Sequence, residues 1–379
     1  MKSSLLYSNN SSKRLLILLM AAHILGTIVA YTVYIKLSSL GDGYAPEDFK
    51  GFTGNLQDLH STIVVHGIYH YLGNFLPGFL TPMALGLVVA IVTWHAFRGV
   101  YAQINRKLFW ICNLFPHFLI WSGSSSKEQI VVIFGVIVIG FAAKRSFSSS
   151  RLNIISLVPI FLSLAVIFFL RPNYFVIYFT IFLTSLIAPT LNKIKINRLS
   201  IGIWAFTFIL TTLGAIIFAS INTTIFSKDM PDWMAAVEAM FLGYDGGSNR
   251  YNIQWNDISD FLSNSLWGIP QGLIGPTLIE AISKPVQFPV FLEGAVYLFI
   301  VCYLFVRIFK LAGTSNMLRV HILPYYFAVL AIVFVSYPYL IFNAGSALRY
   351  KQAMHPVLIF YPLLILAYAR ANNLIKRNP

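Results

Sequence analysis

Hydrophobic residues gather along this chain in long runs that are separated by short polar stretches. Most runs approach the roughly 20 residues with which an α-helix crosses the hydrocarbon core of a membrane. The first run follows basic residues, as in a signal peptide. It is longer than the apolar core of a signal peptide and no small-residue cleavage site follows it, so we expect a retained helix. The pattern predicts an all-α polytopic membrane protein with about ten transmembrane helices, at 15–36, 79–96, 108–122, 129–143, 154–170, 175–190, 201–222, 290–306, 321–342 and 356–370.

Four of the predicted helices are short for a membrane span, and they form two hairpins. These are 108–122 with 129–143, and 154–170 with 175–190. Helices of this length can be tilted, broken or re-entrant. If the hairpins stop below the outer surface, Lys127, Glu128 and Arg171 would lie in a cavity there. Ionisable residues at such depth are candidates for a functional site.

Composition agrees with this membrane prediction. Hydrophobic residues make up 57% of the 379 and charged residues 11%, whereas a soluble chain carries roughly 25% charged residues. The mean hydropathy is +0.72. Cys112 and Cys302 both lie in apolar runs, so no disulfide framework is indicated. We expect a single integral-membrane domain over residues 1–379.

Basic residues are concentrated in alternate short loops and at both ends of the chain. These segments hold most of the 27 Lys and Arg and none of the 13 Asp and Glu. The positive-inside rule assigns them to the cytoplasm. We therefore predict a multi-pass protein of inner-membrane type with both termini cytoplasmic. The net charge of +14 follows from this topology, and no interleaved aromatic and basic stripe indicates a nucleic-acid partner.

Two outer, periplasmic loops are large enough to build a surface, residues 37–78 and 223–289. The first contains a stretch from His60 to Leu76 with helix-like spacing of apolar and aromatic residues. The second contains the apolar, Pro- and Gly-punctuated sequence LWGIPQGLIGP. We expect interfacial helices in both loops, joined by Gly and Pro turns.

Several basic residues oppose the topology rule, because they lie near helix ends or in outer loops. A guanidinium fork suits phosphate oxygens, so these residues are candidates for binding the pyrophosphate or phosphate of a lipid carrier. The alternatives are ion pairing with the outer acids and simple interfacial anchoring. The candidates are Lys127, Arg171, Arg250, Arg349 and Lys351.

Two carboxylates are candidates for acid–base chemistry on the same side. Asp42 lies in a Gly-Asp-Gly turn just beyond the first helix, where it could accept a proton from a sugar hydroxyl or only form the turn. Glu128 follows the sequence SGSSSK at a hairpin tip. It could be a general base or a sugar-binding group, or a capping charge on the next helix.

A metal site is weakly indicated. His66 and His70 have the spacing of one helix face, but no adjacent carboxylate pattern accompanies them, so interfacial packing is favoured. Phosphate-binding, dinucleotide-binding and nucleophile-elbow motifs are absent. The sequence therefore assigns neither metal ligands nor a cofactor.

With these residues laid out, the chain resembles the bacterial O-antigen and exopolysaccharide repeat-unit polymerases, within the broader group of multispanning glycosyltransferases that use polyprenyl-linked sugars. The local similarities are GDGYAPED, WSGSSSKEQ, IPQGLIGP and NAGSALRYKQAMHP. The resemblance implies transfer of a growing glycan from undecaprenyl pyrophosphate to a hydroxyl of the next lipid-linked unit. Basic residues would hold the pyrophosphates, and Asp42, Glu128 or His355 would activate the hydroxyl. The expected partners are the lipid-linked oligosaccharide, membrane lipid and a chain-length regulator.

Two other functions stay open at this point. A membrane-embedded transferase that takes a polyprenyl-phosphate sugar would place a catalytic acid in its first outer loop, as Asp42 is placed, but the usual second acid is missing near it. A transporter or flippase for lipid-linked sugars would be expected to show inverted repeats and charges midway along its spans, and neither is visible in the sequence.

Overall fold

The computed structural model describes residues 9–34, 61–148, 153–191, 258–312 and 339–372, with single positions between them that include Asn249 and Arg250. Regular structure in these ranges is helical, with no strand and one isolated bridge, Asn249 to Asn343. The predicted all-α class is confirmed for them. Asp42 and the predicted span 201–222 lie outside the described residues, as does most of 321–342.

The chain divides into two compact units. Unit 1 comprises Met1–Arg171 and Gln352–Pro379. Its described helices are α1 (Asn9–Val29), η1 (Ala30–Tyr34), α3 (Ser61–Gly73), α4 (Leu80–Phe97), η4 (Tyr101–Gln103), α5 (Arg106–Asn113), α6 (Pro116–Ser122), α7 (Lys127–Ser146), η5 (Ile154–Leu157), α8 (Val158–Leu170), η8 (Pro356–Phe360) and α17 (Tyr361–Ala371). Unit 2 is Pro172–Lys351. Its described helices are α9 (Pro172–Leu191), α12 (Ile258–Ile274), α13 (Leu278–Ser283), η7 (Pro285–Gln287) and α14 (Phe288–Ala312). Helix α16 (Ala344–His355) runs from unit 2 into unit 1.

Five of the described helical segments are long and apolar enough to cross a membrane. They are Asn10–Val33, Leu80–Phe97, Lys127–Ser146, Pro285–Lys310 and Ala344–Ala371. Each overlaps a predicted span, and the residues Ile154–Leu170 and Pro172–Leu186 form shorter apolar helices where two more were predicted. The structure therefore supports a membrane-associated protein, whereas the full set of ten spans stays a prediction.

Two predicted boundaries are wrong. Residues 108–122 are not one continuous helix but the two short helices α5 and α6, because Pro116 opens α6 and the residue before it, Phe115, has a non-helical backbone (φ −56°, ψ 125°). The last span begins at Ala344 instead of residue 356, so the sequence GSALRYKQAMH is helix and not an outer loop. Arg349 consequently lies within a helix and does not end one.

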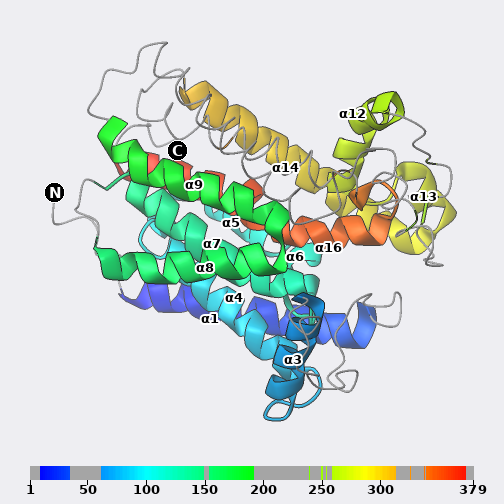
Figure 1. Cartoon of the computed structure of the whole chain (residues 1–379), viewed down its shortest axis with the longest axis horizontal. Helices are drawn as coiled ribbons and strands as arrows, with labels where there is room; N and C mark the ends of the chain where they lie inside the picture. The colour runs from blue at the N-terminus through cyan, green and yellow to red at the C-terminus, as the bar shows by residue number, and fades with distance from the viewer. Residues whose placement is uncertain are drawn as a thin grey trace. The chain divides into compact units, whose positions relative to one another are not determined.

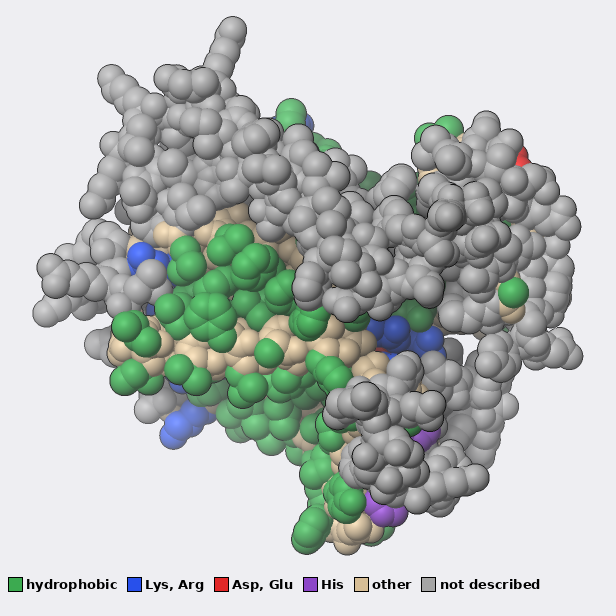
Figure 2. Space-filling model, in the orientation of Figure 1, with side chains coloured by type: hydrophobic (Ala, Val, Ile, Leu, Met, Phe, Trp, Pro, Cys, Tyr) green, Lys and Arg blue, Asp and Glu red, His purple; other side chains and the backbone are tan. Residues whose placement is uncertain are grey.

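Helix α7 is the centre of unit 1. It packs on α4 and α8, and α1 packs on α4, so these four helices run side by side in Figure 1. Nearly every residue from Lys127 to Val138 is buried. In contrast, α8 exposes large apolar side chains such as Phe161 and Leu162, and Figure 2 shows hydrophobic side chains along this helix. An apolar outer face around a packed inner helix fits a bundle that meets lipid.

Unit 2 has a comparable apolar face on α14. Leu292, Val296, Phe299 and Tyr303 are exposed at intervals of three and four residues, so they form one stripe along the helix. Buried residues such as Tyr297 and Leu304 lie on other faces of α14. The helix therefore has one packed side and one side suited to lipid.

Close approach of helices in unit 1 depends on Gly123, at the C-terminal end of α6. A Cβ atom there would lie 2.7 Å from the Cα atom and 2.8 Å from the backbone nitrogen of Thr27 in α1. The backbone conformation at Gly123 (φ −100°, ψ 7°) is open to other residues. Packing and not backbone freedom therefore requires glycine at this position.

We expect Gly123→Ala to lower the stability of unit 1 by about 1–3 kcal/mol, because the methyl group overpacks the contact with α1. The shift in thermal unfolding of the purified protein measures this. Gly99→Ala is the matched control, since a Cβ atom at Gly99 meets no other atom within 4 Å. Equal unfolding midpoints for the two variants would contradict this account of α1 packing.

Candidate functional site

A run of buried polar residues precedes and opens α7 in unit 1. We call Ser122 to Gln129, with Tyr69 and Arg171, the α7 polar cluster. Ser122, the three serines 124–126 and the next three residues are all buried. Ser126 is the N-cap of α7, and its hydroxyl accepts a hydrogen bond from the backbone N–H of Gln129 at 3.2 Å. This cap explains why the helix begins at Lys127 and fixes the direction of the side chains that follow.

Glu128 and Arg171 form an ion pair in this cluster. They are 43 residues apart in the sequence and come from the start of α7 and the end of α8. The Glu128 side chain is 2% exposed and the Arg171 side chain 20% exposed. Glu128 also lies in the first turn of α7, where a carboxylate is stabilised by the helix dipole. The structure thus brings a predicted base and a predicted phosphate-binding residue into direct contact.

Lys127 connects the α7 polar cluster to the start of α3, within the predicted first outer loop. Its ammonium donates to the hydroxyls of Ser61 at 2.9 Å and Thr62 at 2.6 Å. Both residues open α3, the helix that was predicted between His60 and Leu76. The lysine is buried, and its partners in these bonds are neutral. The cluster therefore has one carboxylate and two cations, a net charge of +1.

Tyr69 and Gln129 are members of the cluster that were not predicted as site residues from the sequence. The Tyr69 hydroxyl donates to Gln129 Oε1 at 2.6 Å and accepts from the backbone N–H of Ser126 at 3.1 Å. Gln129 Nε2 donates to the carbonyls of Pro82, at 2.9 Å, and Ser122. The unbroken polar run before α7 was the available signal. It could not reveal that Tyr69 of α3 completes the network.

His355 occupies an aromatic environment in unit 1. Its ring stacks on Phe118 with centroids 4.3 Å apart, and it lies 5.5 Å from His117 and 4.8 Å from Phe360. The side chain is buried. These contacts describe a packed histidine between α6 and η8, and its role as a base stays a prediction.

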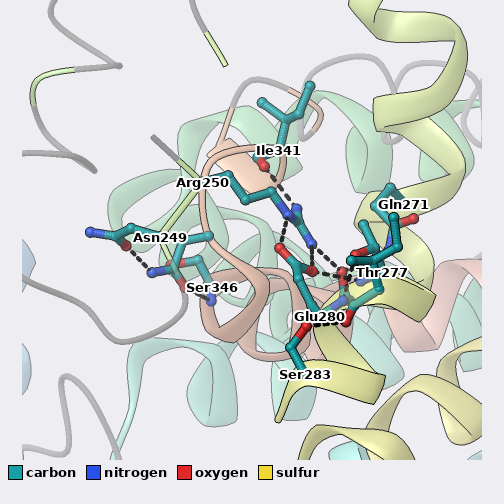
Figure 3. Close-up of polar contacts among 11 residues, drawn as sticks. Asn249, Arg250, Gln271, Thr277, Glu280, Ser283, Ile341 and Ser346 are labelled. Carbon is teal, nitrogen blue, oxygen red and sulfur yellow. Dashed lines mark hydrogen bonds and ion pairs between the residues drawn. The ribbon is translucent and has the colours of Figure 1, made fainter. Parts of the chain in front are cut away.

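Arg250 in unit 2 is held by the protein on several sides (Figure 3). Its guanidinium donates to both carboxylate oxygens of Glu280, at 2.7 and 2.9 Å, to the Ile341 carbonyl at 2.8 Å and to the Gly275 carbonyl at 2.7 Å. Gly275 has φ +104°, a conformation that favours glycine. Four of the five N–H donors of an arginine are used here. This geometry favours a structural role over the predicted binding of pyrophosphate.

Glu280, which pairs with Arg250, also caps the N-terminus of α13. Glu280 accepts from the backbone N–H of Thr277, whose hydroxyl accepts from the Glu280 N–H, so the two form a capping box on α13. Burial raises the pKa of the Glu280 carboxyl, but hydrogen bonds from Arg250 and Thr277 outweigh it and leave the pKa below its usual range. Asn343 extends this region: its side-chain amide donates to Asn249 Oδ1 and accepts from the backbone N–H of Ser346. Figure 3 labels Asn249 and Ser346.

The remaining two basic candidates, Arg349 and Lys351, belong to the unit 2 part of α16. Arg349 lies over the ring of Tyr350 at 5.0 Å. Lys351 is fully buried with its ammonium 5.2 Å from the centre of the Tyr297 ring, and it interacts electrostatically with Glu293 of α14. No hydrogen-bond partner for this ammonium is found within the described ranges. Both residues lie inside a candidate span.

The predicted residues therefore separate into distinct environments. Lys127, Glu128 and Arg171 share the α7 polar cluster, and the other described candidates lie elsewhere. Among the described residues, no group of three or more His, Cys, Asp or Glu side chains could hold a metal ion. Comparison of the chain with family models, curated proteins and solved structures gives no match.

Proposed function

We propose that this protein is a glycosyltransferase of the bacterial inner membrane that polymerises lipid-linked oligosaccharide repeat units at the outer face. The observation that carries the proposal is the α7 polar cluster. It combines a buried carboxylate with two cations at one end of a helix that is long and apolar enough to span a membrane. Its ligands would be an undecaprenyl-pyrophosphate-linked oligosaccharide donor and acceptor in the lipid bilayer, and a chain-length regulator would be its protein partner.

Charge along α7 supports an outer location for the cluster. Lys144 and Arg145 lie in the last turn of this helix, and the positive-inside rule assigns that end to the cytoplasm. Glu128, at the opposite end, is then on the outer side. The ion pair with Arg171 requires α8 to end on that side too, which agrees with the same assignment.

The transfer would form one bond and break one. The oxygen of an acceptor sugar hydroxyl bonds to the anomeric carbon of the donor glycan, and the bond from that carbon to the pyrophosphate oxygen breaks. The hydroxyl proton passes to the Glu128 carboxylate as general base. Arg171 and Lys127 stabilise the negative charge that stays on the departing undecaprenyl pyrophosphate.

A gene deletion tests this function through the lipid-linked glycan pool, resolved by length on a gel. Loss of the long-chain ladder with persistence of single repeat units supports the polymerase. A truncated unit that lacks one sugar would instead identify a single-sugar transferase. An unchanged ladder would contradict the proposal.

Transport of lipid-linked sugars is the second candidate, because Lys351 is a buried charge within a candidate span. Such residues often mark substrate pathways. In the deletion strain, complete repeat units confined to the inner leaflet would favour transport. Units that reach the outer leaflet but do not grow would favour polymerisation.

A further inference from the structure

The Glu128–Arg171 pair joins two groups whose proposed tasks exclude each other while they are paired. A carboxylate that accepts a hydrogen bond from a guanidinium has fewer positions left to accept the proton of a sugar hydroxyl. A guanidinium that is bound to a carboxylate has fewer donors for phosphate. In the structure, the Arg171 guanidinium and the Glu128 carboxylate are bound to each other.

We propose that this ion pair is an exchangeable latch: the pyrophosphate group of a ligand displaces Glu128 from Arg171 and thereby releases the carboxylate as a base. The inference rests on the proposed function and specifies how its site would be regulated. The base would become available only when a pyrophosphate occupies the guanidinium. Activation of a hydroxyl without a donor in place would be suppressed.

Exposure of the two side chains sets the direction of exchange. A fifth of the Arg171 side chain is exposed, whereas Glu128 is 2% exposed. Arg171 is therefore the member of the pair that a ligand can reach first, and Glu128 is enclosed by the cluster.

Charge favours pyrophosphate over the carboxylate at Arg171. Pyrophosphate offers several acceptor oxygens and more than one negative charge, and it can take a bidentate geometry on the guanidinium. Lys127, the next residue to Glu128, adds a second cation whose described hydrogen bonds go to neutral hydroxyls. Both cations can then act on the ligand after Arg171 has left Glu128.

The latch predicts opposite changes in pyrophosphate affinity when Glu128 and Arg171 are replaced. Removing the competing carboxylate with Glu128→Gln should tighten binding of inorganic pyrophosphate by roughly 3- to 30-fold, since the guanidinium then has to leave a neutral amide and not a carboxylate. Arg171→Gln should weaken binding at least about tenfold, through loss of a charged, bidentate contact. Titration calorimetry on the purified full-length protein measures both.

Matched variants keep this test sharp. Glu128→Asp preserves the competing charge and should bind more weakly than Glu128→Gln. Arg98→Gln removes an exposed arginine at the end of α4 that stacks on Trp94, and it should bind as the unchanged protein does. Thermal unfolding of each variant shows whether it is folded, and only Arg171→Gln and Glu128→Gln should differ in affinity among folded variants.

An unchanged or weaker affinity in folded Glu128→Gln would overturn the latch and leave the pair as a structural anchor. Repeating the titration with vesicles that contain undecaprenyl pyrophosphate separates a lipid headgroup from a free anion. The same order of affinities is expected there, and binding of the inorganic ion alone would contradict a lipid donor. The titration does not measure transfer, so the two proposals can fail separately. If Glu128→Gln binds pyrophosphate more tightly and the deletion strain still makes the glycan ladder, the latch is retained and the polymerase function is refuted.

Discussion

Replacing Glu128 by glutamine is expected to abolish growth of the glycan chain while the protein is retained in the membrane. Glutamine preserves the size of the side chain and can still accept a hydrogen bond from Arg171, but it cannot take a proton from a sugar hydroxyl. Loss of a general base lowers a rate by about 10²- to 10⁴-fold. In a deletion strain that expresses the variant, the long-chain ladder should disappear and single lipid-linked units should accumulate.

Two variants control for this result. Glu128→Asp keeps a carboxylate and should restore part of the ladder. Asp260→Asn removes a carboxylate from the first turn of α12, outside the α7 polar cluster, and should leave the ladder unchanged. Protein amount in the membrane is measured for each. A normal ladder from Glu128→Gln would show that Glu128 is not the base and would direct attention to Asp42 or His355.

Arg250→Ala is expected to cause the largest loss of stability in unit 2. The substitution removes a buried guanidinium that bonds Glu280 bidentately and also bonds the carbonyls of Gly275 and Ile341. It leaves a partly buried carboxylate without its partner. Breaking a buried ion pair in this way costs about 3–5 kcal/mol. Thermal unfolding of the purified protein, or the rate of proteolysis near α13, measures the loss.

Its matched control is Lys310→Ala, which removes an exposed basic side chain from the last turn of α14. This change should leave stability nearly the same. Arg250→Lys should fall between the two, because an ammonium cannot reproduce the planar, bidentate contact. Comparable stability for Arg250→Ala and Lys310→Ala would argue that Arg250 is not a structural residue and would revive its predicted part in phosphate binding.

Hydrophobic periodicity predicted the helices of the fold better than their ends. Runs of apolar residues predicted α1, α4, α7 and α14 because a membrane span needs an apolar surface over its whole length. The start of α16 was missed because GSALRYKQAMH is polar. Its side chains are mostly buried against protein, and hydropathy cannot distinguish a polar residue in a packed helix from one in a loop. The break before Pro116 was predictable from proline itself.

The candidate site shows a different limit. Charge alternation predicted that Lys127, Glu128 and Arg171 share the outer side, and the structure gathers these three at one end of α7 and α8. Pairing depends on how helices are rotated against each other, which sequence spacing alone does not fix. The bond between Arg250 and Glu280 joins residues 30 positions apart, and no local pattern marks it. Tyr69 was likewise not recognised as a site residue, because it lies in an apolar helix.

The most direct test of the proposed function uses the purified protein in liposomes that contain only a lipid-linked repeat unit with undecaprenyl pyrophosphate. The account predicts products longer by whole repeat units, with one undecaprenyl pyrophosphate released for each bond formed. Glu128→Gln should yield neither. Intact substrate after incubation with a folded, unmodified protein, or transfer of a single sugar in place of a whole unit, would contradict it.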